Sequence, residues 1–98
     1  MVEQGDIIKI NSFSQLALVV SKDTYNHTGM AIICPILNYP TTSTFEVEVV
    51  VDDTIMYVES DSLRQLDLKS RAYTKKGRLQ YNKLIYVIDM AQSVIDYY

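Results

Sequence analysis

Two unbroken apolar runs constrain the fold of this chain more than any other feature. They span residues 17–20 and 30–34 and flank a polar middle that ends in Gly29. Runs rich in β-branched residues and bounded by turn formers predict two adjacent strands joined by a loop. Because neither run alternates with polar residues, we expect both faces of each strand to be covered by other parts of the chain.

The loop between these runs has room for one helical turn starting at Ser21 or Asp23. Gly29 suits a positive φ just before the second strand. Pro35 follows the second run directly and cannot donate a hydrogen bond to a strand ladder, so we expect it to end or kink that strand.

Other segments add strands to this pair. Residues 7–10 follow a Gly-Asp turn and predict a first strand, and residues 45–51 alternate in polarity with the odd-numbered residues facing inward. Asp52-Asp53 is a tight-turn signal, so residues 55–59 should pair back as the other arm of a hairpin. Residues 60–67 fit either a helical turn or a strand.

The C-terminal segment, residues 81–98, carries a helical period. Its apolar positions recur at the spacing of one helix face: Leu84, Val87, Ile88, Ala91, Val94 or Ile95, and Tyr98. About five strands and one amphipathic helix predict a mainly β fold with helical additions, built as a small, strongly bent sheet or barrel. The length fits a single domain over residues 1–98.

Charge is unevenly distributed. The net charge is −3, yet residues 64–78 hold six basic residues and one acid. Such a local patch attracts phosphates even on an acidic protein, although the same charges would suit solvated loops and helix ends. Eight tyrosines supply stacking surfaces for a single-stranded nucleic acid, RNA or DNA, and would equally suit a protein interface.

Cys34, the one cysteine, excludes an internal disulfide and lies in an apolar run, where a buried thiol is expected. The single histidine, His27, lies in a polar loop and fits a solvated surface residue. Classical metal, P-loop and dinucleotide motifs are absent, so we expect no cofactor and no metal ion. No apolar run reaches membrane-spanning length and the N-terminal residues do not read as a leader, so we expect a cytoplasmic protein without membrane contact.

Several motifs in sequence order resemble the MazF/PemK family, the toxins of bacterial toxin–antitoxin pairs. They are Gly5-Asp6-Ile7, Ala17-Leu18-Val19-Val20-Ser21, Asp23 with Tyr25-Asn26, Thr28-Gly29, Cys34-Pro35-Ile36, Phe45-Glu46-Val47, the segment from Asp61 to Asp67, Arg71, and Gly77-Arg78-Leu79. The resemblance implies a small SH3-like barrel of the CcdB/PemK type. It also implies a homodimer that cuts RNA without a metal and is held in check by an antitoxin.

The chain departs from the family where the chemistry is expected. The long loop between the first two strands is reduced to residues 11–16, and the family's catalytic arginine and threonine fall on Gln15 and Leu37. An arginine used by some members falls on Glu59. Asp61 is retained, as a general base positioned by Arg64 or, in a structural role, as a turn cap or a partner of Arg64. We therefore expect the usual catalytic set to be broken.

Binding is the stronger expectation. The residues that we expect to contact nucleic acid are Lys9, Ser14, Gln15, Lys22, Arg64, Arg71, Tyr73, Lys75, Lys76 and Arg78. Three functions stay open at this point: a toxin that binds and cuts RNA, a non-catalytic nucleic-acid-binding or regulatory module of the same fold, and a module that acts on a protein partner such as an antitoxin, host or phage factor.

Overall fold

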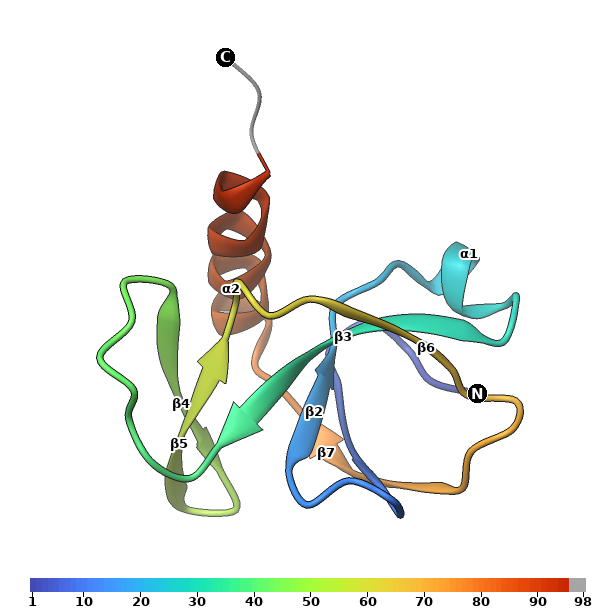
Figure 1. Ribbon diagram of the computed structural model, residues 1–98. Coiled ribbons are helices and arrows are strands. Elements are labelled where there is room, and N and C mark those ends of the chain that lie inside the picture. The colour runs from blue at the N-terminus through green and yellow to red at the C-terminus, as the bar shows by residue number, and fades with distance from the viewer. Residues whose placement is uncertain (96–98) are drawn as a thin grey trace.

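The structure, a computed structural model, describes residues 1–95 and consists of a curled antiparallel sheet with a C-terminal helix (Figure 1). The mainly β expectation is confirmed, with more strands than the sequence pattern predicts. The strands are β1 (Asp6–Ile10), β2 (Leu16–Val19), β3 (Met30–Leu37), β4 (Glu46–Val51), β5 (Thr54–Glu59), β6 (Arg64–Asp67) and β7 (Tyr73–Arg78), and the helices are α1 (Asp23–Asn26) and α2 (Tyr81–Val94).

The sheet runs in the order β4-β5-β3-β2-β1-β7, and β6 pairs with the free end of β3. Strand β3 therefore has β2 along one side and two successive partners, β6 and then β5, along the other. Figure 1 shows the consequence: the β4–β5 hairpin and α2 lie on one side of the molecule, and α1 and β6 lie on the other.

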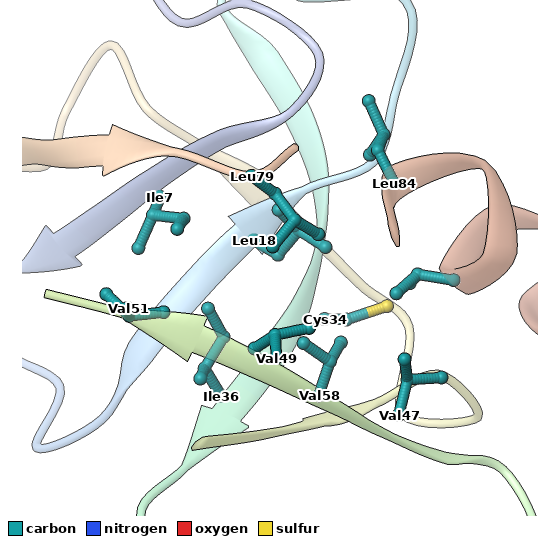
Figure 2. Packing of buried hydrophobic residues seen from close by; sticks show 11 residues of the cluster. Ile7, Leu18, Cys34, Ile36, Val47, Val49, Val51, Val58, Leu79 and Leu84 are labelled. Atoms are coloured by element: carbon teal, nitrogen blue, oxygen red, sulfur yellow. The ribbon is translucent and has the colours of Figure 1, made fainter. Parts of the chain in front are cut away.

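The two central strands are covered on both faces, as their continuous apolarity predicts. Successive strand residues point to opposite faces. Leu18 of β2 packs in the cluster that reaches β4, β5 and α2 (Figure 2), whereas its neighbours Ala17 and Val19 pack in a second cluster with Ile8 and Leu66. An apolar residue therefore fits at every position of these strands.

Strand β3 continues through Cys34 and Pro35 to Leu37, so of the two expected outcomes at Pro35, an end or a kink, the end is excluded. The register explains why proline is tolerated. On one side Pro35 lies opposite Ala17 of β2. On the other side β6 pairs only as far as Ile33, and β5 pairs only from Ile36 onward. Pro35 thus occupies the gap between two partners, where no ladder hydrogen bond is needed.

The predicted hairpin is confirmed in detail. Val47, Val49 and Val51 are buried and Glu48 is exposed. The turn residues Asp52 and Asp53 have φ values of 51° and 63°, the positive values at both central positions that a type I′ hairpin turn requires.

Two strands were hard to recognise from the pattern. The pattern of residues 60–67 fits either a helical turn or a strand. In the structure, residues 64–67 of this segment form strand β6. Strand β7, in the basic segment, was not predicted, because five of its six residues are exposed and no polarity alternation marks it. It forms because its backbone pairs with β1, with a bulge between Ile7 and Ile8 that leaves Lys76 outside the regular register.

Helix α2 buries Leu84, Val87 and Ala91, as predicted. Its last turn differs from the expectation: Val94 and Ile95 are both exposed. The predicted contribution of Tyr98 falls outside the described residues. Within residues 1–95, no helix is long and apolar enough to cross a membrane.

The doubly covered central strands lead to a stability prediction. Leu18 is fully buried, so Leu18→Ala should lower the free energy of unfolding by about 2–5 kcal/mol, measured by urea denaturation. Val50→Ala, on the exposed face of β4, is the matched control and should cost less than about 1 kcal/mol. Equal losses in the two variants would contradict the packing described here.

Candidate functional site

The register of the two central strands brings Gln15 and Leu37 together. Leu16 lies opposite Ile36 in the β2–β3 ladder, so the next pair of positions outward is Gln15 and Leu37. Both residues line one cavity of about 310 Å³, which is bordered by Ser14, Asn38 and Tyr39. Two residues 22 positions apart in sequence therefore share one site because of a strand register.

This cavity is polar at its rim and holds no charge. Gln15 is exposed and Leu37 is 7% exposed. The described residues around the cavity are Ser14, Gln15, Leu16, Ile36, Leu37, Asn38, Tyr39 and Met56, none of which is an acid, a base or a histidine. Amide, hydroxyl and phenol groups can hydrogen-bond a ligand here, and the exposed Tyr39 offers a ring for stacking.

Asp61 does not join this cavity. It is exposed and follows β5, on the side of the sheet where Ser60 meets Cys34. Cys34 and Leu37 are three residues apart along β3, which corresponds to about 10 Å. The expected pairing of Asp61 with Arg64 is also missing, since the ion pairs of the described residues do not include it.

Asp61 acts instead on the buried thiol of Cys34. Burial, and to a smaller extent the negative charge of the nearby Asp61, raise the pKa of Cys34 to about 12. A thiol with this pKa stays protonated near neutral pH, so Cys34 is a poor nucleophile there.

Glu59 is committed to the scaffold. It is 8% exposed and lies opposite Glu46 in the β4–β5 register. The Thr41 hydroxyl lies 2.7 Å from Glu59 Oε1 and 2.9 Å from Glu46 Oε2, and the Thr41 backbone N–H also donates to Glu46. The two carboxylates therefore hold the loop between β3 and β4, the loop that contributes Asn38 and Tyr39 to the cavity.

The predicted basic segment separates into two groups with different partners. At one end, the buried carboxylate of Asp6 lies 3.3 Å from Lys75 Nζ and 3.0 Å from Arg78 Nη1. Arg78 also contacts Glu3 and donates to the Gln4 carbonyl. These two cations are largely neutralised, so their share of the expected nucleic-acid surface is reduced.

At the other end, two arginines meet one aromatic ring. The guanidinium carbons of Arg64 and Arg71 lie 5.4 Å and 5.5 Å from the ring centroid of Phe13, in the short loop between β1 and β2. Phe13 packs against the cluster beneath it, as does Tyr73. Lys9 joins this group, because its ammonium donates to the backbone carbonyls of Ile10 and Phe13.

The remaining expected contacts are spread out. Lys22 is the residue at the start of α1, at the opposite end of β2 from Ser14 and Gln15. Lys76 sits in the β7 bulge. His27 is exposed, in agreement with a surface role. Among the described residues no three His, Cys, Asp or Glu side chains are placed to hold a metal ion.

Several residues that shape the site escaped sequence reasoning. Asp6 looked like a turn residue, because its partners Lys75 and Arg78 lie about seventy positions away. Phe13 is a single aromatic residue in a polar loop, and its partners Arg64 and Arg71 lie more than fifty positions away. Tyr39 was one of eight tyrosines with no feature to distinguish it. The motif residues Ser21 and Asn26 have a structural role. The Ser21 hydroxyl donates to the side-chain carbonyl of Asn26, the last residue of α1, and the Asn26 amide donates to the backbone carbonyl of Ser21.

Comparison with known proteins places this geometry in context. Residues 3–94 match the family described as PemK-like, MazF-like toxin of type II toxin–antitoxin system. Among curated proteins no sequence matches.

Solved structures match over almost the whole chain. A MazE–MazF structure from Deinococcus radiodurans is 26% identical with a TM-score of 0.83, covering 96% of this chain and 95% of that one. MazF from the same organism is 24% identical with a TM-score of 0.84, covering 96% of each chain. An endoribonuclease in complex with its cognate antitoxin, from a mycobacterial species, is 18% identical with a TM-score of 0.77, covering 96% and 97%.

The raised pKa of Cys34 gives a chemical test of the site. Because its thiol is protonated and buried, iodoacetamide at pH 8 should leave the folded protein unlabelled and should label the urea-unfolded protein. The thiol ionises more readily in the unfolded chain, where its pKa is 9.0, than in the folded protein, where it is about 12. Its contribution to the free energy of unfolding is therefore fully present below pH 9.0 and is lost as the pH rises toward about 12. Cys34→Ala, which has no thiol, should lack that part of the alkaline loss. Rapid labelling of the native protein would contradict the burial of Cys34.

Proposed function

The chain belongs to the PemK-like, MazF-like toxin family of type II toxin–antitoxin systems, and on this premise we propose that it is an RNA-binding member that has lost the family's metal-independent RNA cleavage. The observation that carries the proposal is the pairing of Gln15 with Leu37 across one cavity. These are the positions at which the family places its catalytic arginine and threonine, and the β2–β3 register brings them together.

The chemistry of RNA cleavage explains why this pairing matters. In metal-independent cleavage the 2′-hydroxyl attacks the neighbouring phosphorus, and the 5′-oxygen leaves. The reaction needs a group to take the 2′ proton, a group to protonate the leaving oxygen, and positive charge on the transition state. Gln15 supplies hydrogen bonds without charge, and Leu37 supplies neither.

The loss should be large. Removing one donor that stabilises a developing negative charge costs on the order of a hundredfold to a thousandfold in rate. Here both family positions have changed, and the described residues around the cavity include no replacement acid or base. Asp61 is not among the residues that line the cavity, so it does not supply the missing group there.

Binding of RNA needs less than cleavage does. The cavity offers amide, hydroxyl and phenol groups that can hydrogen-bond a nucleotide, and Tyr39 is 54% exposed at its rim. Stacking of a base on an exposed aromatic ring contributes to binding without sequence selection. Together these groups support binding of single-stranded RNA.

The partners in this proposal are a second copy of the chain and an antitoxin, acting in the cytoplasm. Support comes from the similarity to a toxin described together with MazE, and to an endoribonuclease described in complex with its cognate antitoxin. The exposed side chains of Val50 and Ile55, which face each other across the β4–β5 hairpin, are apolar surface of the kind that protein interfaces cover.

RNA cleavage in EDTA tests the loss of catalysis. The purified protein should leave a long single-stranded RNA intact. The double variant Gln15→Arg with Leu37→Thr, which restores the family residues, should cut it measurably faster. Gln80→Arg, which adds the same charge at an exposed position beside α2, is the matched control and should not. Efficient metal-independent cutting by the unmodified protein, co-purifying with it through successive columns, would overturn the proposal.

The oligomeric state tests the proposed self-association. Light scattering during gel filtration should give a mass of about twice the 11.2 kDa of one chain. A monomer mass that persists at high micromolar concentration would contradict the homodimer.

A further inference from the structure

Phe13, Arg64 and Arg71 form a cluster that the proposed function leaves without a role. The two guanidinium carbons lie 5.4 Å and 5.5 Å from the centre of the same ring, although the arginines come from β6 and from the loop after it. We propose that this cluster binds a backbone phosphate of single-stranded RNA and supplies the positive charge that is missing at Gln15. The inference rests on the proposed function and adds the residues that hold the strand.

The charges of this cluster are available to a ligand. Both arginines are exposed, and neither takes part in an ion pair of the described residues. Lys75 and Arg78, by contrast, share the buried carboxylate of Asp6. Of the basic residues predicted to contact nucleic acid, the pair at Phe13 is therefore better placed to meet an external anion than the pair at Asp6.

The ring positions the guanidinium groups and leaves their hydrogen bonds free. A guanidinium attracted to an aromatic ring keeps donors that can point toward an external anion. Planar N–H pairs match phosphate oxygens in a bidentate arrangement, which gives stronger hydrogen bonds than neutral groups form. Phe13 packs against the apolar cluster beneath it, so the ring is a fixed support.

The surroundings increase the positive potential. The ammonium of Lys9 donates to the carbonyl of Phe13, which brings a third cation to the loop. Residues 11–15 contain no acid. Two guanidinium groups on one ring, no more than about 11 Å apart, repel each other. A bound phosphate would relieve this repulsion, whereas a cluster that only packed the loop would gain nothing from the second charge.

The position fits a strand that enters the cavity. Phe13 precedes Gln15 by two residues, which an extended chain covers in about 7 Å. In the proposed arrangement, a strand whose base stacks on Tyr39 has an adjacent phosphate at the arginines. Positive charge that is absent at Gln15 would then come from Arg64 on β6 and Arg71 in the loop after it, both held at the Phe13 ring.

Binding of a short fluorescently labelled RNA, followed by anisotropy at several salt concentrations, tests this site. Arg64→Gln and Arg71→Gln should each weaken binding about tenfold. For single strands the slope of log K against log salt should fall by about 0.7 for each lost phosphate contact. Lys83→Gln, the same charge change on α2, should leave both quantities unchanged. Circular dichroism and thermal melting verify that each variant is folded.

Charge-retaining variants separate binding from packing. Arg64→Lys and Arg71→Lys should keep the salt slope near that of the unmodified protein, because a lysine still neutralises a phosphate. If the arginines only support the loop, the Lys and Gln variants should behave alike, and that result would overturn the inference.

The outcomes distinguish the inference from the function on which it rests. The first case is that the unmodified protein binds RNA and the double variant Arg64→Gln with Arg71→Gln keeps the same affinity and salt slope. The cluster at Phe13 then does not bind phosphate, and RNA binds at another part of the protein. If the unmodified protein binds no RNA, the proposed function fails and the inference fails with it. Binding of an acidic peptide instead of RNA, lost in the same variants, would assign the cluster to a protein partner and overturn the proposal.

Discussion

The pairing of β2 with β3, buried on both faces, is the constraint on which the rest of the structure depends. One face of the pair carries Leu18, Cys34 and Ile36, which pack toward α2 and the β4–β5 hairpin. The other carries Ala17, Val19 and Ile33, which pack toward β6. A slip of one residue would turn each apolar side chain to the opposite cluster. Since both clusters are filled, the register is determined, and with it the position of every residue at the strand ends.

The candidate site is a direct result of that register. Gln15 lies in the loop just before β2 and Leu37 is the last residue of β3, and they meet because Leu16 lies opposite Ile36. The same geometry keeps Asp61 away, because it lies on the far side of Cys34 along the strands. In the function that we propose, the scaffold of the family is preserved while the two side chains that would do its chemistry differ. Preservation of a fold and preservation of its activity are separate questions.

The cations of the basic segment, residues 64–78, fall into two groups with different partners, which the number of basic residues in the sequence does not show. Asp6 is buried and lies within 3.3 Å of Lys75 and Arg78, so it takes up much of the charge at that end. Arg64 and Arg71 have an aromatic ring in place of a carboxylate. The ring holds the guanidinium groups without neutralising them, and only such cations contribute fully to the attraction of an anionic polymer.

The sequence alone determined the central strands, the β4–β5 hairpin with its Asp52-Asp53 turn, the buried stripe of α2 and the absence of charge at Gln15, because each follows from a local pattern or a single residue type. Tertiary structure decided the rest. Strand β7 has no alternation and exists through pairing with β1, and Pro35 is tolerated because two partners of β3 meet there. The partition of the cations depends on residues distant in sequence. Such contacts arise from the packing of the whole chain, so no window of neighbouring residues contains them.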